Sequence, residues 1–227
     1  MLKQIAKNRI FSLVFRAAAF ALCLAGLIST CFADGSFSPQ ILLYYTTQSN
    51  ILVFVYFAVV VVKTAIDIKK HGKTGSSSYF ERLSAAFMIA ISVTMLVFWT
   101  LLVPSVEEMT GDPSFIYSFS NLQVHLTTPL LMIADYIIFT ARGKLKKNDP
   151  FLFTLIPIAY FIQATILGFS GVVYRSDPTL GDIHFPYFFI DYYQVGWMVA
   201  VYVAVIAAFF VGVSNGILYH DIKYAKK

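Results

Sequence analysis

Long apolar runs separated by short polar segments dominate the pattern of this chain. Six runs are long enough for a helix to cross a hydrocarbon core about 30 Å thick, which takes roughly 20 residues at about 1.5 Å each. They cover residues 10–29, 42–62, 83–103, 122–140, 151–171 and 193–218. The runs are apolar on every side, whereas the strands of a membrane β-barrel alternate apolar and polar positions. We therefore predict an all-α fold, a bundle of six transmembrane helices that forms a single domain over residues 1–227.

The composition supports a membrane protein. Hydrophobic residues make up 58% of the chain and charged residues 13%, whereas soluble domains carry about 25% charged residues. These figures exclude a disordered chain, a nucleic-acid-binding domain and a secreted disulfide scaffold. The two cysteines, Cys23 and Cys31, are too few for a disulfide framework or a Cys-x-x-Cys zinc site. We expect no metal, no cofactor and no nucleic-acid partner.

The basic residues gather on one side of the predicted membrane. Sixteen of the 17 lie before or at the opening of the first run, in the second and fourth links, or after the last run: Lys3, Lys7, Arg9, Arg16, Lys63, Lys69, Lys70, Lys73, Arg82, Arg142, Lys144, Lys146, Lys147, Lys223, Lys226 and Lys227. Links on the other side carry Arg175 and the acidic residues Asp34, Glu107, Glu108, Asp112, Asp177, Asp182 and Asp191. Positive charge collects on the cytoplasmic side, so we expect both termini in the cytoplasm. The first run exceeds the 7–15 apolar residues of a signal peptide, so we expect a retained helix.

One histidine lies inside an apolar run, where ionisable residues are costly and are candidates for function. His125 belongs to a stripe on one face of the predicted fourth helix, at spacings of 4, 3, 4 and 3 residues: Asn121, His125, Thr128, Met132 and Asp135. This face must meet protein or water rather than lipid. The stripe fits hydrogen bonding between helices and an active site equally well, and both interpretations stay open.

A second polar cluster opens the second run, at residues 44–50. It fits an interfacial belt, because tyrosine favours the membrane boundary. However, Thr47 lies sixteen residues from Lys63 and His125 lies seventeen from Arg142, so both lie about 24–26 Å above the cytoplasmic charges. A threonine at this depth becomes a nucleophile if a base such as His125 takes its proton.

Two carboxamides accompany this pair. Asn50 lies one helical turn from Thr47, and Asn121 lies one turn from His125. Either amide is a candidate donor to the oxyanion that forms during ester hydrolysis. Hydroxyl, imidazole and carboxamide at one level are the parts of a nucleophilic hydrolase.

Three blocks carry a family resemblance. Residues 45–52 read Tyr-Thr-Thr-Gln-Ser-Asn-Ile-Leu, residues 125–131 read His-Leu-Thr-Thr-Pro-Leu-Leu and run on to Asp135, and residues 184–187 read His-Phe-Pro-Tyr and run on to Asp191. These blocks resemble the androgen-induced membrane hydrolase family and, more closely, its bacterial six-span relatives. The resemblance implies an enzyme of the bacterial cell membrane with Thr47 as nucleophile and His125 as base. The preceding residue is a second threonine, Thr46, and the choice of Thr47 rests only on its spacing to Asn50. Animal members hydrolyse fatty acid esters of hydroxy fatty acids, so the implied substrate is a lipid ester.

The two acids that end these blocks have structural interpretations. Asp135 lies about 15 Å deeper than His125, too far to orient the ring, and we expect it to be neutral or paired within the bundle. Asp191 fits the cap of the sixth helix, although it is also placed to line an entrance. Two other functions remain as alternatives: a transporter or channel with a path along Asp135, Gln163 and His125, and a non-catalytic membrane scaffold.

Overall fold

The computed structural model describes residues 2–33, 35–104, 113–177 and 181–225. Within these residues, six helices are long and apolar enough to cross a membrane, and they span Arg9–Cys31, Tyr45–His71, Glu81–Leu102, Phe119–Phe139, Asp149–Phe169 and Met198–Ala225. The predicted all-α, six-span fold is thereby confirmed. The chain is an integral membrane protein.

Several of these spans are composite. The first, second and sixth spans are the single helices α2 (Arg9–Cys31), α3 (Tyr45–His71) and α11 (Met198–Ala225). The third joins α4 (Glu81–Val97) to the π-helical turn η2 (Phe98–Leu102), and the fourth joins α6 (Phe119–Leu122), the π-helical turn η4 (Gln123–Thr127) and α7 (Thr128–Phe139). The fifth consists of α8 (Asp149–Phe153) and α9 (Leu155–Phe169). The shorter elements are α1 (Leu2–Ile5), η1 (Pro39–Leu43), η3 (Pro113–Phe115), the antiparallel strands β1 (Arg175–Asp177) and β2 (Gly181–Ile183), η5 (Phe188–Ile190) and α10 (Tyr192–Val195).

The sixth span begins later than predicted. The apolar run begins at residue 193, but the long helix begins at Met198. Gly196 has a φ of +55°, a left-handed conformation that glycine adopts without a steric penalty, and it ends α10 before the span starts. Hydrophobicity alone does not reveal this break, because the residues on both sides of it are apolar.

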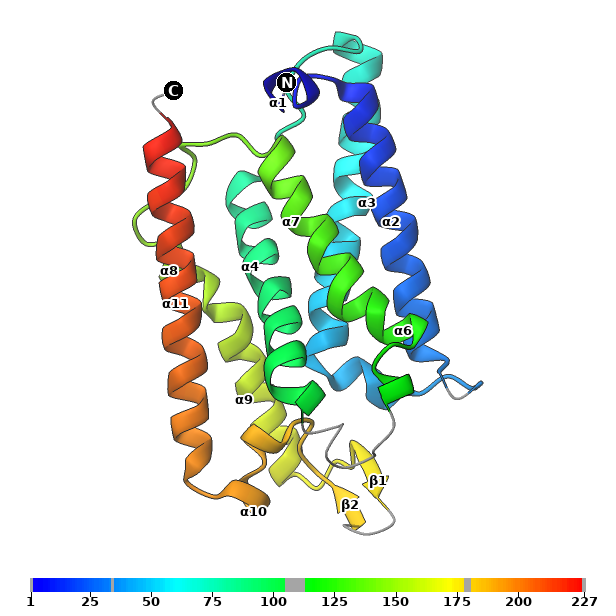
Figure 1. Cartoon of the computed structure of the whole chain (residues 1–227), viewed down its shortest axis with the longest axis vertical. Coiled ribbons are helices and arrows are strands. Elements are labelled where there is room, and N and C mark those ends of the chain that lie inside the picture. The colour runs from blue at the N-terminus through cyan, green and yellow to red at the C-terminus, as the bar shows by residue number, and fades with distance from the viewer. Residues whose placement is uncertain (1, 34, 105–112, 178–180, 226–227) are drawn as a thin grey trace.

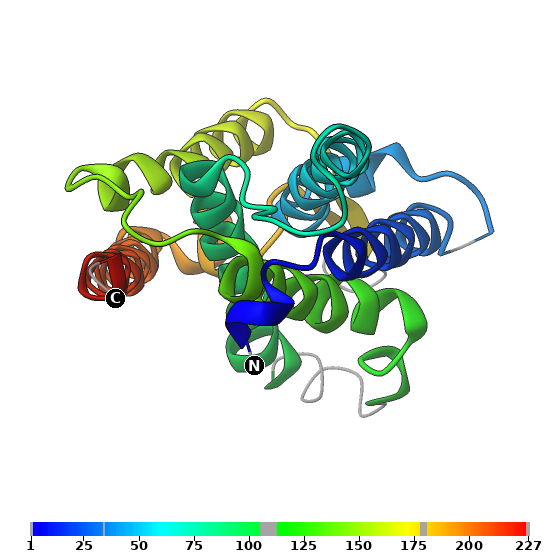
Figure 2. The same ribbon diagram turned by 90° about the horizontal axis from the view of Figure 1, so that it is seen from above.

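The helices run antiparallel, with α4 and α7 at the centre of the bundle (Figures 1 and 2). Half of the most apolar window of the third and fourth spans is buried, against only 17% for α11. The sixth helix is therefore peripheral, and most of its surface is left for lipid. It packs against α8, η5 and α4.

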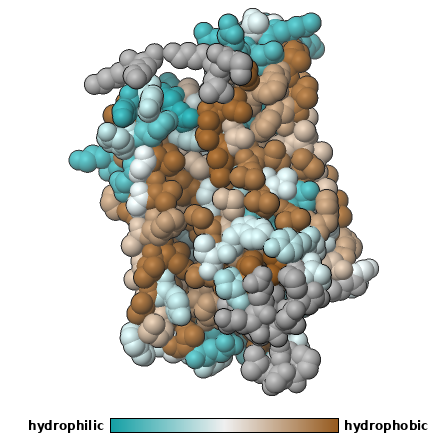
Figure 3. All heavy atoms as spheres, in the orientation of Figure 1, coloured by the Kyte–Doolittle hydropathy of each residue, from teal (hydrophilic) through white to brown (hydrophobic). Residues whose placement is uncertain are grey.

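The two ends of the bundle differ in charge. One end, here called the basic end, carries α1, the α3–α4 and α7–α8 links and the last turn of α11, while the hairpin end carries β1, β2 and α10 (Figure 1). Hydrophilic side chains gather at the basic end, and an apolar belt follows below it (Figure 3). An even number of crossings thus leaves both ends of the chain on one side, as the charge pattern predicts. Of the acidic residues expected opposite, Asp34, Glu107, Glu108 and Asp112 lie outside the described residues.

Candidate functional site

The third and fourth spans each contain a π-helical turn toward the hairpin end. Such turns are rare and occur frequently at functional sites. The turn η4 contains His125, and the neighbouring turn η2 contains Phe98 and Trp99. The Phe98 ring stacks on the His125 imidazole, with ring centroids 3.7 Å apart and an interplanar angle of 12°. The two irregular turns therefore meet at the histidine that the sequence singles out.

Pro129 explains why backbone groups are free at this point. Thr128 donates its N–H to the Gln123 carbonyl, five residues back, instead of to the Val124 carbonyl. Pro129 has no N–H, so it cannot donate a hydrogen bond to the carbonyl of His125, four residues before it, or of Val124, five residues before it. The carbonyl oxygens of Val124 and His125 consequently lose their usual helical donor. A buried carbonyl needs a partner, and here side chains of other spans supply it.

Two neighbouring spans donate to these carbonyl groups. Asn50 Nδ2 of α3 lies 3.1 Å from the Val124 oxygen, and Trp99 Nε1 of η2 lies 3.2 Å from the His125 oxygen. Asn50 Nδ2 also donates to the Thr46 carbonyl, at 2.8 Å. The sequence block at residues 45–52 thus contacts the start of the block at residues 125–131, and this contact docks α3 onto the fourth span.

This contact corrects the expected role of Asn50. The sequence suggested that its amide donates to an oxyanion, but both N–H bonds of the amide are used by backbone carbonyls. The Asn50 side chain is 1% exposed. Asn50 therefore links the Thr46 main chain to the π turn of the fourth span.

The imidazole of His125 is oriented by its own helix. Nδ1 lies 3.2 Å from the Asn121 carbonyl oxygen, which only accepts, so in the neutral ring Nδ1 carries the proton and Nε2 keeps its lone pair. Asn121 was expected to donate to an oxyanion through its side chain. Instead, its side-chain amide donates to the Phe115 carbonyl at 2.7 Å, and its main chain orients the histidine.

The hydroxyl that faces this lone pair belongs to Thr46. Thr46 Oγ1 lies 3.3 Å from His125 Nε2, and the Thr46 side chain is half-buried at the wall of a cavity. The sequence favoured Thr47 from its spacing to Asn50, whereas the structure places Thr46 beside the ring. Thr47 points about 100° around the helix from Thr46 and is 2% exposed. The predicted approach of α3 to His125 at one depth occurs, but through the neighbouring threonine.

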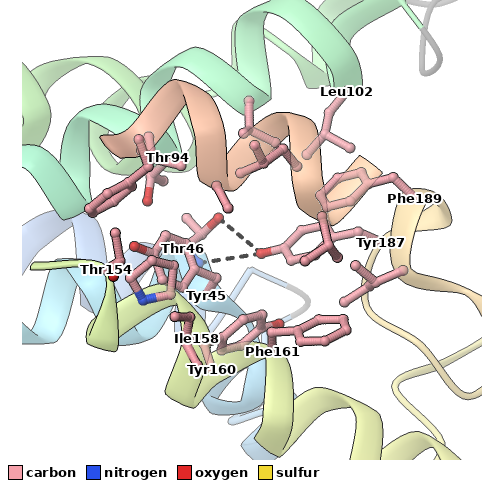
Figure 4. A pocket seen from close by; sticks show the side chains of 18 residues that line it. Tyr45, Thr46, Thr94, Leu102, Thr154, Ile158, Tyr160, Phe161, Tyr187 and Phe189 are labelled. Atoms are coloured by element: carbon pink, nitrogen blue, oxygen red, sulfur yellow. Dashed lines mark hydrogen bonds between the residues drawn. The ribbon is translucent and has the colours of Figure 1, made fainter. Parts of the chain in front are cut away.

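Tyr187, in the segment between β2 and η5, completes the cluster. Its hydroxyl accepts the Thr46 backbone N–H at 3.4 Å and lies 3.5 Å from Thr46 Oγ1 (Figure 4). Burial raises the pKa of the Tyr187 phenol above its ordinary value, so the group stays protonated at neutral pH and has a proton to donate. Tyr187 belongs to the third sequence block, but its contact with Thr46 was not predictable, because chain spacing does not relate a loop to a helix end.

A cavity of about 120 Å³ adjoins Thr46 and lies between α3, α4, α9 and α11. Its wall consists mainly of aliphatic and aromatic side chains, among them Ile158, Phe161 and Phe189 (Figure 4). The Thr46 hydroxyl and the Tyr187 phenol lie in this wall. The site is suited to an apolar ligand that carries a small polar group.

Asp135 lies apart from this cluster, in an ion pair deep in the bundle. Its Oδ1 lies 2.6 Å from Arg16 Nε, and both side chains are 0% exposed. Tyr56 donates to the other carboxylate oxygen at 2.9 Å. Of the two states expected for Asp135, neutral or paired within the bundle, the structure shows the paired one. The expected place of Arg16 at the cytoplasmic opening is wrong, because the residue lies almost two turns inside α2 and points into the bundle.

Asp191 caps a helix, as expected, although not the sixth span itself. Its Oδ1 accepts the backbone N–H groups of Tyr193 and Gln194, at 2.9 and 3.2 Å, at the start of α10. The side chain is 4% exposed. Its place at a helix N-terminus satisfies backbone donors that would otherwise lack partners.

Over the described part of the chain, no three histidine, cysteine or acidic side chains lie close enough together to hold a metal ion. Comparisons with protein-family models, with curated proteins and with solved structures find no match for this chain.

Proposed function

We propose that this protein is an integral-membrane hydrolase that cleaves lipid esters with Thr46 as nucleophile and His125 as general base. The observation that carries the proposal is the 3.3 Å approach of Thr46 Oγ1 to His125 Nε2 at the wall of an apolar cavity. A nucleophile and a base within hydrogen-bond reach, with the base oriented by a third group, are the signature of covalent acyl transfer. The sequence resemblance to the androgen-induced membrane hydrolases supports the same class and suggests fatty acid esters of hydroxy fatty acids, or similar esters, as substrates.

The chemistry follows from the two atoms that meet. His125 Nε2 takes the Thr46 hydroxyl proton while Oγ1 attacks the ester carbonyl carbon. The tetrahedral intermediate then expels the alcohol, which receives the proton from Nε2. Water, deprotonated by the same nitrogen, attacks the acyl-threonine and releases the fatty acid and free Thr46. No cofactor enters these steps.

Two features near Thr46 favour the negative charge that develops. Thr46 lies in the first turn of the 27-residue helix α3, where the positive end of the helix dipole stabilises anions. The Tyr187 phenol is placed to donate to the oxyanion or to the leaving oxygen. Tyr187 therefore takes the role that the sequence analysis gave to Asn50 and Asn121.

The charge pattern supports a membrane orientation with the basic end in the cytoplasm. The catalytic pair would then lie in the outer leaflet, because Thr46 is close to the start of α3 at the hairpin end. The resemblance to bacterial six-span proteins suggests a bacterial cell membrane.

A proton or ion path through Asp135 is less consistent with the geometry. A transport path needs a carboxylate that can bind and release a proton or an ion. Asp135 instead forms an ion pair with Arg16 and accepts a hydrogen bond from Tyr56, and the side chains of the ion pair are 0% exposed. The transporter alternative therefore lacks its central residue.

The test is ester hydrolysis by purified single variants in lipid nanodiscs, with a long-chain ester of a fluorogenic alcohol as substrate. Thr46→Ala and His125→Gln should each remove nearly all turnover, and the double variant should lose little more, because residues that act as a unit are strongly non-additive. Thr46→Ser should retain part of the activity. Thr47→Ala is the matched control, one residue away on the same helix, and should stay close to the wild-type rate. Loss of turnover in folded Thr47→Ala with activity preserved in Thr46→Ala would refute the proposal.

A further inference from the structure

The hydrogen-bonding groups of the cavity wall are concentrated around Thr46 and Tyr187. Tyr160 packs against Tyr187 and adds a buried hydroxyl without a hydrogen-bond partner among the described residues, whereas the Tyr45 hydroxyl donates to the Ala90 carbonyl. Two other threonines line the cavity, but their hydroxyl groups are already bonded. Thr94 Oγ1 lies 2.8 Å from Ser49 Oγ, and Thr154 Oγ1 donates to the Phe151 carbonyl at 2.6 Å. Away from the catalytic cluster, the wall therefore offers a ligand mainly apolar contacts.

The apolar part of the cavity is elongated along the bundle axis. On α11 it is lined by Val203, Ile206, Ala207 and Phe210, whose spacing of 3, 1 and 3 residues defines one helix face. These residues cover about 10.5 Å of helix length. The fifth span lines the cavity over a similar length, with Thr154, Pro157, Ile158, Tyr160 and Phe161. Phe210 is 1% exposed and lies at the end toward the basic side.

The cavity also opens sideways. Phe161, Val203 and Ala207 line both the cavity and a shallow groove on the surface formed by α10, α11 and α9. Ala207 is exposed, and the neighbouring Trp197 is 77% exposed. Figure 2 shows α9 and α11 on the side of the bundle away from α2. The opening therefore lies within an apolar, lipid-facing surface.

We infer that this cavity is the acyl-chain site of the hydrolase and that its substrate enters from the bilayer, between α9 and α11. The inference rests on the proposed function, because the Thr46–His125 pair fixes where the ester carbonyl lies. The occupant is a single unbranched acyl chain, with its carbonyl at Thr46 and Tyr187 and its tail along the α9 and α11 faces toward Phe210. The apolar wall matches a hydrocarbon chain, and the sideways opening spares the chain a passage through water.

Chain-length selectivity tests this inference. Wild type and variants are assayed against esters of one fluorogenic alcohol with acyl chains of four to sixteen carbons. Ile206→Trp fills the cavity and Ala207→Trp obstructs its opening, so each should lower kcat/KM for the longest chains at least tenfold and leave the four-carbon ester nearly unchanged. Val205→Trp is the matched control on the same helix, because Val205 is 63% exposed and does not line the cavity. An unchanged chain-length profile in both cavity variants would overturn the inference.

A second measurement needs no bulky substitution. A diazirine-labelled palmitate ester is photo-crosslinked to the folded Thr46→Ala protein in membranes, and the adducts are mapped by mass spectrometry. Adducts should concentrate on Phe161, Val203 and Ile206. Adducts confined to lipid-facing positions such as Val205 would contradict the inference. Failure of the proposed function would look different, because wild type would then hydrolyse no ester or hydrolysis would continue in Thr46→Ala.

Discussion

The buried Arg16–Asp135 pair makes a quantitative prediction about stability. Arg16 bridges three parts of the bundle: Nε and Nη2 bond the two oxygens of Asp135 at 2.6 and 3.3 Å, and Nη1 bonds Thr64 Oγ1 and the Ser77 carbonyl at 3.2 and 2.8 Å. Removing one charge leaves the other buried and uncompensated. Breaking such a pair typically costs about 3–5 kcal/mol, whereas replacing both partners by apolar side chains of similar volume is often neutral.

We therefore expect Asp135→Asn and Arg16→Met each to lower the free energy of unfolding by about 3–5 kcal/mol. The double variant Arg16→Met/Asp135→Leu should recover most of this loss. Thermal unfolding of the detergent-solubilised proteins measures the effect, and a double-mutant cycle isolates the coupling between the two residues.

Activity separates this structural role from a catalytic one. Asp135 lies ten residues, about 15 Å along the helix, from His125. Folded Asp135→Asn molecules should therefore hydrolyse esters at a near-normal rate per molecule. Wild-type stability in the single variants would refute the energetic argument. Complete loss of turnover in a fully folded Asp135→Asn variant would bring Asp135 into the mechanism.

Three further predictions concern the site and the orientation. Trp99→Phe should destabilise the protein by about 1–3 kcal/mol in thermal unfolding, because the buried His125 carbonyl loses its donor; an unchanged melting temperature would contradict that role. Tyr187→Phe should lower kcat about 100-fold with the fold intact, as expected for one lost oxyanion donor, and a wild-type kcat would exclude the phenol from catalysis. In intact cells, an impermeant thiol reagent should label a cysteine at Asp182 but not one at Lys70 of an otherwise cysteine-free chain; the reverse pattern would invert the proposed orientation.

The spans were predictable because the membrane imposes one requirement on all of them. A helix of some 20 apolar residues spans the hydrocarbon core and pairs its own backbone N–H and C=O groups. Such a run of apolar residues is visible directly in a sequence. Depth was also predictable, since the helical rise converts residue counts into distance. This is why Thr47, one residue from the threonine that meets His125, could be placed near that level.

Direction around the helix axis was not predictable from spacing. The choice between Thr46 and Thr47 depends on how α3 is rotated, and the contact of Asn50 with a carbonyl freed by Pro129 fixes that rotation. A prediction from residue spacing also assumes a regular helix. In the fourth span the π turn η4 breaks this regularity, because it replaces the usual helical hydrogen bonds.

Arg16 was missed for a different reason. In a sequence, a basic residue near the start of a span is indistinguishable from the basic residues that flank spans on the cytoplasmic side. Only its ion pair with a residue on another helix shows that Arg16 is buried. The partner, Asp135, stood out in the sequence because no such flank surrounds it.

The site of covalent modification tests the central claim most directly. Purified wild-type protein is incubated with a long-chain fluorophosphonate, which forms a stable bond with an activated hydroxyl, and the modified residue is identified by peptide mass spectrometry. The account predicts one adduct, on Thr46, that disappears in His125→Gln. An adduct on Thr47, or modification of Thr46 at an equal rate without His125, would contradict it.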